Sequence, residues 1–305
     1  MSNWTIDNIP SQKGKIVLIT GANSGTGFGA SKALAKKGSK VIMAVRNLEK
    51  GKVAAVKIKN EIPNADIELI ELDLADLNSV DQFSVKFINK YPQLDILINN
   101  AGIAIPNGRT ETKQGFESHF GTNHLGHFAL TGKLLSLLSI TKNSRVVTVG
   151  SFVPKQSKSK IRWEDWQYKF DFDGMKAYGQ SKLANIMFAL ELQEKLSASN
   201  SSTISVLANP GFTKSGMQKD MNFVAKLMTL FFSQSVDMGI LSILRAATDE
   251  NVRGGEFYGP LHMKEMRGYP ELTQAPQEAM IDSEREKLWK LSEQLTNTAY
   301  DFPNQ

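Results

Sequence analysis

The chain has 305 residues, with 36 lysines and arginines, 31 aspartates and glutamates, and no cysteine. The lack of cysteine excludes disulfides and thiolate chemistry and suits a reducing compartment, so we expect a cytoplasmic protein. The net charge of +5 is spread along the chain among nearly as many acids, which is typical of a solvated surface and argues against nucleic acid as a partner.

No targeting or membrane segment is expected. Residues 1–10 lack the apolar stretch of a signal peptide, and no run approaches about eighteen consecutive apolar residues. The chain also shows no internal repeat, low-complexity tract or linker. We therefore expect a single domain over residues 1–305.

The first predicted strand, residues 15–20, is a short run of apolar and β-branched residues. A glycine turn with Gly21, Gly25 and Gly27 follows it and leads into a helical pattern that ends near Gly38. This order brings backbone N–H groups and the positive end of a helix to one point, which predicts a phosphate site. The alternative is a turn that serves only the chain geometry.

A second strand, residues 40–45, ends at Arg46. In nucleotide-binding folds an acid at this place binds the ribose hydroxyls of NAD, whereas an arginine suits the 2′-phosphate of NADP. Arg46 therefore predicts NADP(H) as the cofactor. The alternative is a solvated arginine that begins a loop.

The first half of the chain continues to alternate strands and helices. A helix over 49–61, a strand over 67–72, a helix over 77–90 and a strand over 94–98 follow in order. This order calls for a parallel sheet with helices on both faces.

A long helix is expected over residues 112–138, with Asn123, His124 and His127 near its centre. Two histidines three residues apart, without cysteine or a third ligand at suitable spacing, make a weak metal site. We predict packing or surface roles for both histidines and no metal.

A fifth strand, residues 145–149, ends at Gly150 and Ser151. Residues 152–175 then form an insertion that is rich in aromatic and basic side chains. It is either a solvated loop with an aromatic anchor or a wall of the substrate pocket, and its position next to Ser151 favours the wall.

Tyr178 and Lys182 lie one helical turn apart in a periodic run that extends to Leu192. A free tyrosine has a pKa of about 10 and is a poor proton shuttle unless a nearby cation stabilises the phenolate. Lys182 would be that cation, and Tyr178 would act as a general acid and base. By itself the pair is common on helices, so the assignment depends on the surrounding motifs.

The last third of the chain begins with a strand over 203–208 and the turn Pro210-Gly211-Phe212-Thr213. Residues 217–232 are strongly apolar and form a substrate lid, a packed helix or a membrane-touching patch, in that order of preference. A helix over 238–248, a strand over 255–258 and an amphipathic helix over 283–295 complete the chain. The fold class is α/β, a Rossmann-type doubly wound parallel sheet of about seven strands.

Together these motifs resemble the single-domain form of the short-chain dehydrogenase/reductase family over essentially the whole chain. The resemblance rests on the glycine turn, Asp73, Asn99-Asn100-Ala101-Gly102, Asn123, Ser151, Tyr178, Lys182 and Pro210-Gly211-x-Thr213, in the family's order. Val45-Arg46-Asn47 and the stretch from Gly254 to Pro260 look most like retinol-dehydrogenase-like and WW-domain-oxidoreductase-like members. Thr26 stands where that family usually has isoleucine or leucine.

The resemblance implies four catalytic residues. Ser151 would bind the substrate oxygen, Tyr178 would transfer the proton, Lys182 would hold the nicotinamide ribose, and Asn123 would support a water that restores the proton. It also implies that Asp73 contacts the adenine and that Thr213 engages the carboxamide or the phosphates. The full predicted cofactor set is Gly21, Asn23, Ser24, Gly25, Thr26, Gly27, Arg46, Asp73, Leu74, Asn100, Ala101, Gly102, Tyr178, Lys182, Pro210, Gly211 and Thr213.

We therefore expect an NADP(H)-dependent oxidoreductase that transfers a hydride between nicotinamide and an apolar carbonyl or alcohol substrate held by residues 152–175 and 212–233. One alternative is a sugar-nucleotide epimerase or dehydratase, which would have another glycine spacing and a larger C-terminal domain. The other is an NADP(H)-binding regulatory or redox-sensing protein with little turnover. Members of the family usually pair through their long helices, so we expect a homodimer or homotetramer formed by residues 112–138 and 175–196.

Overall fold

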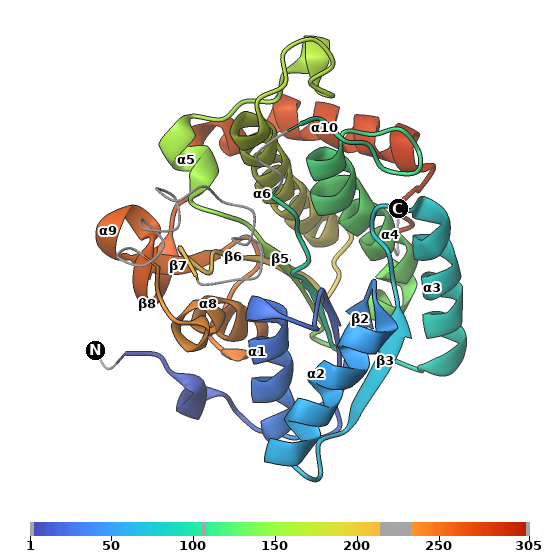
Figure 1. Ribbon diagram of the computed structural model, residues 1–305, viewed down its shortest axis with the longest axis vertical. Coiled ribbons are helices and arrows are strands. Elements are labelled where there is room, and N and C mark those ends of the chain that lie inside the picture. Colours follow the sequence, from blue (N-terminus) through green and yellow to red (C-terminus); the bar gives the residue numbers. More distant parts are fainter. Residues whose placement is uncertain (1–2, 105–107, 214–232, 303–305) are drawn as a thin grey trace.

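The computed structural model describes residues 3–104, 108–213 and 233–302 (Figure 1). Its eight strands form one sheet in the order β3-β2-β1-β4-β5-β6-β7-β8. The first seven strands pair in parallel, and β8 pairs with β7 in the antiparallel direction. The strands are β1 (Ile16–Thr20), β2 (Lys40–Val45), β3 (Ile67–Glu71), β4 (Ile96–Asn99), β5 (Arg145–Val149), β6 (Ile204–Ala208), β7 (Phe257–Leu261) and β8 (Arg267–Thr273).

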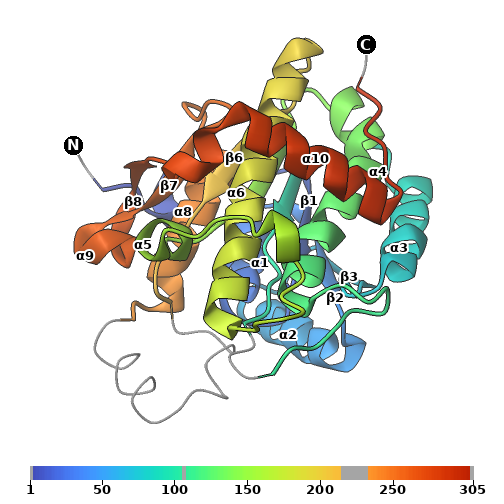
Figure 2. The ribbon, with the colours of Figure 1, turned by 90° about the horizontal axis from the view of Figure 1, so that it is seen from above.

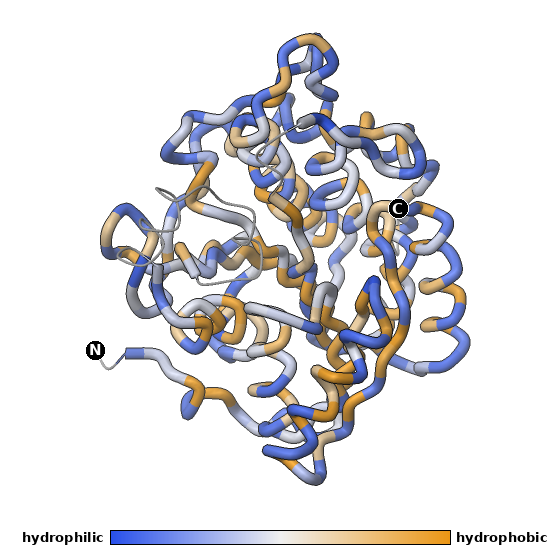
Figure 3. Tube along the Cα trace, viewed as in Figure 1, coloured by the Kyte–Doolittle hydropathy of each residue, from blue (hydrophilic) through white to orange (hydrophobic). Residues whose placement is uncertain are grey.

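Helices cover both faces of this sheet because the strands send alternate apolar side chains to opposite sides. In β1, Val17 and Ile19 join a core with α1 (Gly25–Lys36), α2 (Leu48–Glu61) and α8 (Val236–Thr248). Leu18 joins a second core with α3 (Leu77–Lys90), α4 (Gly126–Ile140), α6 (Gly174–Ala198) and α10 (Asp282–Thr296). Figure 3 shows hydrophobic segments concentrated in the strands between these layers, so the doubly wound α/β prediction is confirmed.

Short elements complete the described chain, and four of its longer helices, α2, α3, α6 and α8, begin where a side chain caps them. The Asn47 side chain accepts from Lys50 N at the start of α2, and Asp173 accepts from two backbone N–H groups at the start of α6. The short elements are η1 (Ile6–Asn8), the π-helix η2 (Phe120–Leu125), α5 (Val153–Ser157), η3 (Trp163–Asp165), α9 (His262–Glu265) and η5 (Gln277–Met280). Among the described residues, no helix combines the length and apolar character needed to cross a membrane.

The helix expected over 112–138 begins later than its pattern suggested. Residues 111–117 form a tight turn in which Thr112 N donates to Phe116 O at 2.8 Å, and Gly115 has a left-handed backbone with φ of +78°. The buried Glu117 carboxylate then accepts the N–H groups of His119 and Phe120 at 2.9 and 2.8 Å. Glu117 thus caps a helix that starts after it, which a window of apolar periodicity does not detect.

The sheet also has one strand more than the expected seven or so. β8 contains Gly268 and Pro270, which weaken a strand pattern, but it lies at the sheet edge, where proline is tolerated. The strand expected over 255–258 is therefore not the last one. It is found two residues later, as β7.

The amphipathic C-terminal helix, expected over 283–295 and found as α10, covers the two helices that we expected to pair with a second copy. Figure 2 shows α10 lying across α6 and α4. Its Trp289 packs against Phe128 of α4 and Phe188 of α6, with ring centroids 5.0 and 5.9 Å apart. The Tyr300 hydroxyl donates to Phe128 O at 2.6 Å. α10 thus covers part of the surface predicted for assembly, and the homodimer or homotetramer stays a prediction.

Candidate active site

The predicted functional residues gather at the carboxyl edge of the parallel strands. The glycine turn follows β1, Asn100 to Gly102 follow β4, Ser151 follows β5, and Pro210 to Thr213 follow β6. Ligands of open parallel sheets bind at this edge, outside the strand ends. The fold therefore assembles in space what the sequence presents in separate segments.

The glycine turn has the backbone geometry of a phosphate cradle. Gly21 and Gly25 adopt left-handed conformations with φ of +65° and +53°. At Gly27 a Cβ atom would lie 2.4 Å from Gly21 O and 2.6 Å from Asn100 Nδ2, so no side chain fits there. The Ser24 hydroxyl at the start of α1 makes no capping bond to the described residues. No side chain caps the first N–H groups of this helix, so they can donate to an anion. The phosphates of a dinucleotide fit such a site.

Thr20 ties this turn to the next strand end, a role that the sequence analysis did not assign. Its hydroxyl accepts from Asn100 N and Ala101 N, each at 2.9 Å, and bonds His127 Nε2 at 2.9 Å. Asn100 Nδ2 donates to Thr20 O at 2.8 Å. The only indication of this role in the sequence was a threonine at the end of an apolar strand. Its partners lie about 80 to 107 residues away, so sequence spacing did not reveal them.

Thr26, which departs from the family pattern, also has a polar partner. Its hydroxyl donates to Asn100 Oδ1 at 2.8 Å. The Asn100 amide is therefore fixed by Thr20 O on one side and by Thr26 on the other. The hydroxyl joins the glycine turn to the turn after β4, where the usual isoleucine or leucine would provide only packing.

The residues at the end of β2 differ in exposure. Val45 is 1% exposed and faces the core against Gly51 of α2, whereas Arg46 is exposed. Arg46 forms no ion pair with the carboxylates of the described residues, so its guanidinium is available for a ligand anion. Only Arg46 of this pair is placed to meet a phosphate on the adenosine ribose.

Asp73 and Leu74 lie just after β3. The Asp73 side chain accepts from Ala75 N at 3.0 Å, which orients the carboxylate within its own turn. The Leu74 side chain is buried in the core, and its carbonyl lies so close to α4 that a Cβ on Gly126 would approach it to 2.4 Å. The Leu74 side chain is therefore closed to a cofactor, and contact through its backbone stays a prediction.

Lys182 is a buried lysine whose ammonium reaches the end of β5. It is 4% exposed, and its Nζ donates to Val149 O at 3.0 Å. Burial lowers the pKa of Lys182 to about 8, because desolvation disfavours the charged form. A Cβ on Gly102 would lie 3.5 Å from this Nζ, so the glycine leaves room beside the ammonium.

Asn123 lies in the π-helix η2, and such irregular turns occur frequently at functional sites. Its Oδ1 accepts from Ile103 N at 2.8 Å, and its Nδ2 donates to Ile103 O and Ser181 Oγ, each at 3.0 Å. The amide thus joins the turn after β4 to the helix that carries Tyr178 and Lys182. These contacts give Asn123 a positioning role, and support of a water stays a prediction.

Tyr178 and Ser151 are brought together as predicted, but the pKa effect differs from the expected one. Burial raises the pKa of Tyr178, and a hydrogen bond with the Ser151 side chain partly opposes this rise. Ser151 Oγ in turn accepts from Val153 N at 3.1 Å. Lys182 was expected to lower the pKa of Tyr178. That expectation is wrong: desolvation, which penalises the phenolate, is the largest cause of the rise, and the hydrogen bond that opposes it comes from Ser151.

The turn after β6 is held closely by its neighbours. The Thr213 hydroxyl donates to Pro210 O at 2.6 Å rather than standing free toward a ligand. Gly211 has φ of +67°, and a Cβ there would come within 2.5 Å of Met266 O. Contact of Thr213 with a carboxamide or phosphate stays a prediction. The apolar residues 217–232 lie outside the described residues.

The two central histidines have packing roles, as predicted. His124 Nε2 bonds Ser292 Oγ of α10 at 2.8 Å, and His127 Nδ1 bonds Asn123 O at 2.8 Å. Within the described ranges no three histidine, aspartate or glutamate side chains gather closely enough to hold a metal ion. Burial lowers the pKa of His124 to about 3 and that of His127 to about 4.

These histidines predict acid sensitivity. Both have folded pKa values below the ordinary 6.5, so their neutral forms favour folding above pH 6.5, and this stability is lost as pH falls toward 4. For His127 the loss is on the order of 3 kcal/mol. In denaturant titrations between pH 7.5 and 4.5, His127→Gln should show a weaker pH dependence of unfolding free energy than the unmodified protein. Equal slopes would contradict the assignment.

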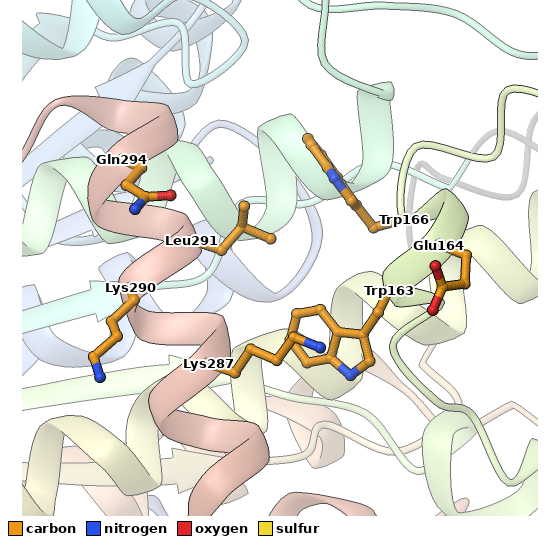
Figure 4. Close-up of a pocket in the computed structure, with 7 residues that line it drawn as sticks. All are labelled: Trp163, Glu164, Trp166, Lys287, Lys290, Leu291 and Gln294. Carbon is orange, nitrogen blue, oxygen red and sulfur yellow. The ribbon is translucent and has the colours of Figure 1, made fainter.

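The insertion after Ser151 contains an aromatic anchor, one of the two roles that its sequence left open, and its role as a wall of the substrate pocket stays a prediction. Trp163 anchors it to α10, since Trp163 Nε1 donates to Glu284 Oε2 at 2.6 Å and Lys287 Nζ lies 4.2 Å from the ring centroid. An open cavity of about 420 Å³ lies there. Figure 4 shows the residues that line it: Trp163, Glu164, Trp166, Lys287, Lys290, Leu291 and Gln294. Phe172, near the end of the insertion, is stacked on His119, and the rings of His119 and Tyr178 are in a T-shaped contact with their centroids 6.2 Å apart.

The fold and this site define a class of protein: an α/β dinucleotide-binding fold with a buried serine, a half-buried tyrosine and a buried lysine at its ligand-binding edge. Known proteins narrow the class. The family model described as short chain dehydrogenase matches residues 15–163. A short-chain dehydrogenase/reductase of Armillaria gallica is 35% identical over 94% of this chain and 92% of its own length. Human retinol dehydrogenase 12 is 34% identical over 94% of this chain and 88% of its own length.

A solved structure agrees with these relatives. A protein of Mycobacterium paratuberculosis has a crystal structure with a TM-score of 0.82 and 37% identity, covering 99% of this chain and 100% of that one. The present chain belongs to the short-chain dehydrogenase/reductase family, a family of oxidoreductases that use NAD or NADP.

Proposed function

We propose that this protein is an NADP(H)-dependent oxidoreductase that interconverts an apolar carbonyl compound and its alcohol. One observation carries the proposal. Ser151 is bonded to Tyr178, and Lys182, one turn further along α6, donates to Val149 O at the carboxyl end of β5. Such a group moves a proton at an oxygen atom.

Each side chain has a distinct task in this proposal. A bound nicotinamide cofactor supplies or accepts the hydride. Tyr178 gives its hydroxyl proton to the substrate oxygen in reduction and removes it in oxidation, while the Ser151 hydroxyl orients that oxygen. Lys182 holds a positive charge below pH of about 8 in a buried place, where it favours the tyrosinate and binds ribose hydroxyls.

The finer choices of cofactor and substrate rest on two further features. The exposed guanidinium of Arg46 favours the extra phosphate of NADP. An apolar substrate is supported by the aromatic ring of Phe172 on the Tyr178 side of the insertion and by relatives that are named retinol dehydrogenases. The apolar character of residues 217–232 agrees with this choice.

The test is a direct assay of turnover. The unmodified protein is mixed with NADPH and a panel of aldehydes, ketones and quinones, and the absorbance at 340 nm is followed. A substrate-dependent fall supports the proposal. Binding of NADPH, measured by fluorescence, without turnover of any compound in the panel would favour the regulatory or redox-sensing alternative.

Replacement of Lys182 should damage both cofactor binding and rate. Lys182→Met keeps the length of the side chain but removes the ammonium, so we expect NADPH affinity to fall about ten- to a hundredfold and kcat to fall as well. The matched control is Lys176→Met, which removes an exposed lysine of the same helix. Unchanged NADPH affinity in fluorescence titrations would remove the ribose role of Lys182.

A further inference from the structure

The helix after Ser151 is too short to be stable by itself. α5 has five residues, whereas isolated helices need more than about twelve to form in water. Its first residue nevertheless has a defined task, because Val153 N donates to Ser151 Oγ at 3.1 Å. This bond occupies one lone pair of the hydroxyl and thereby restricts its orientation beside Tyr178. Contacts from outside α5 must therefore hold that amide in place.

Those contacts come from α9, which is far from α5 in the sequence. Lys155 Nζ lies 2.5 Å from Glu265 Oε1, and Gln156 Nε2 donates to Lys264 O at 2.7 Å. Figures 1 and 2 both show α5 and α9 next to each other. About 110 residues separate the partners, so this is a tertiary contact and not part of a local turn.

Glu265 is itself firmly anchored. Its residue is 9% exposed, Thr273 Oγ1 of β8 donates to Glu265 Oε1 at 2.8 Å, and Asn209 Nδ2 donates to Glu265 O at 3.2 Å. Met263, Lys264 and Glu265 all have left-handed backbones, with φ of 52°, 56° and 66°. Consecutive non-glycine residues in this conformation are unfavourable and persist only where surrounding contacts impose them, frequently at functional sites.

We propose that the Lys155–Glu265 ion pair positions α5 and thereby holds the Ser151 hydroxyl in line with Tyr178. The chain of contacts runs from the anchored carboxylate of Glu265 through Lys155 to α5, then through Val153 N to Ser151 and on to Tyr178. Lys155 and Glu265 are positioning residues, because neither touches the reacting atoms. The inference rests on the proposed function and adds to it a determinant outside the known motifs.

Lys155→Met tests this inference in the whole protein. We expect kcat to fall about tenfold while NADPH affinity is unchanged, since one oriented hydrogen bond is lost and the cofactor site is intact. In the direction of alcohol oxidation the midpoint of the pH–rate profile should move to higher pH, because Ser151 no longer opposes the effect of burial on Tyr178. Lys155→Arg keeps the charge and should restore most of the rate.

The matched control is Lys133→Met, which removes an ion pair of 2.7 Å with Asp81 between α4 and α3. It should alter neither kcat nor the pH midpoint. If Lys155→Met behaves like this control, the inference is overturned.

A second readout keeps the inference separate from the proposed function. If the unmodified protein turns over no substrate, the proposed function fails, and amide hydrogen exchange still tests the contact. Lys155→Met should then speed exchange at Val153 N relative to Lys133→Met. Equal exchange rates in the two variants would refute the positioning role.

Discussion

Tyr178→Phe is expected to lower kcat by about a hundred- to ten-thousandfold, the usual contribution of a positioned general acid and base. The substitution removes only the hydroxyl, so the T-shaped contact of the ring with His119 stays in place. NADPH should therefore bind with nearly unchanged affinity, as measured by fluorescence titration. A variant that binds the cofactor and does not turn over would separate the proton transfer from cofactor binding.

Tyr91→Phe is a matched control for this experiment. Tyr91 is a buried tyrosine that follows α3 and packs against Phe87 in the core. Its replacement should leave kcat unchanged. If Tyr178→Phe retained the turnover of the unmodified protein, Tyr178 would not be the proton donor.

Most elements of the fold were predictable because their signals are local. The strand over 40–45 and the helix over 77–90 were found with the expected bounds, since each has a clear apolar period and a distinct end. Glu117 illustrates the limit. Its carboxylate ends one turn and caps the next helix through contacts only two and three residues away, yet a glutamate within an apolar period looks like any exposed helical position.

The long helices show a different limit. Periodicity indicates that a helix has an apolar face, but it does not indicate what covers that face. α4 and α6 were expected to meet a second copy, and they meet α10 of the same chain through Trp289. The amphipathic pattern of α10 was visible in the sequence. The surface on which α10 packs was not visible. It depends on the path of the connection between α8 and α10, which is more than 30 residues long.

At the site, the sequence predicted which residues gather but not how they influence one another. Tyr178 bonds Ser151, and Lys182 reaches Val149 O at the end of the strand that leads to Ser151. The direction of the Tyr178 pKa depends on desolvation, which is a property of the packed environment and not of the spacing between two residues. Thr20 and the Lys155–Glu265 pair were missed for a related reason, since their partners are brought together only by the sheet topology.

The preference for NADP over NAD is the second property for which we expect a large effect of substitution. The burial of Val45 and the exposure of Arg46 decide which of the two residues to replace. Val45 is 1% exposed, so an acid there would place a charge in the core and destabilise the protein. Arg46 is exposed, and an aspartate at this position is tolerated by the fold. Arg46→Asp removes the cation that favours the 2′-phosphate and adds an anion that repels it and accepts from ribose hydroxyls.

The unmodified protein should prefer NADP to NAD by about ten- to a hundredfold, since a charge-assisted hydrogen bond contributes roughly 1.5–3 kcal/mol. Arg46→Asp should reverse that preference in fluorescence titrations with NADPH and NADH, while turnover through Tyr178 continues with NADH. Lys57→Asp is the control, because it makes the same change of net charge at an exposed position of α2. If Arg46→Asp and Lys57→Asp change the ratio of the two affinities equally, general electrostatics and not a contact from Arg46 sets the cofactor preference.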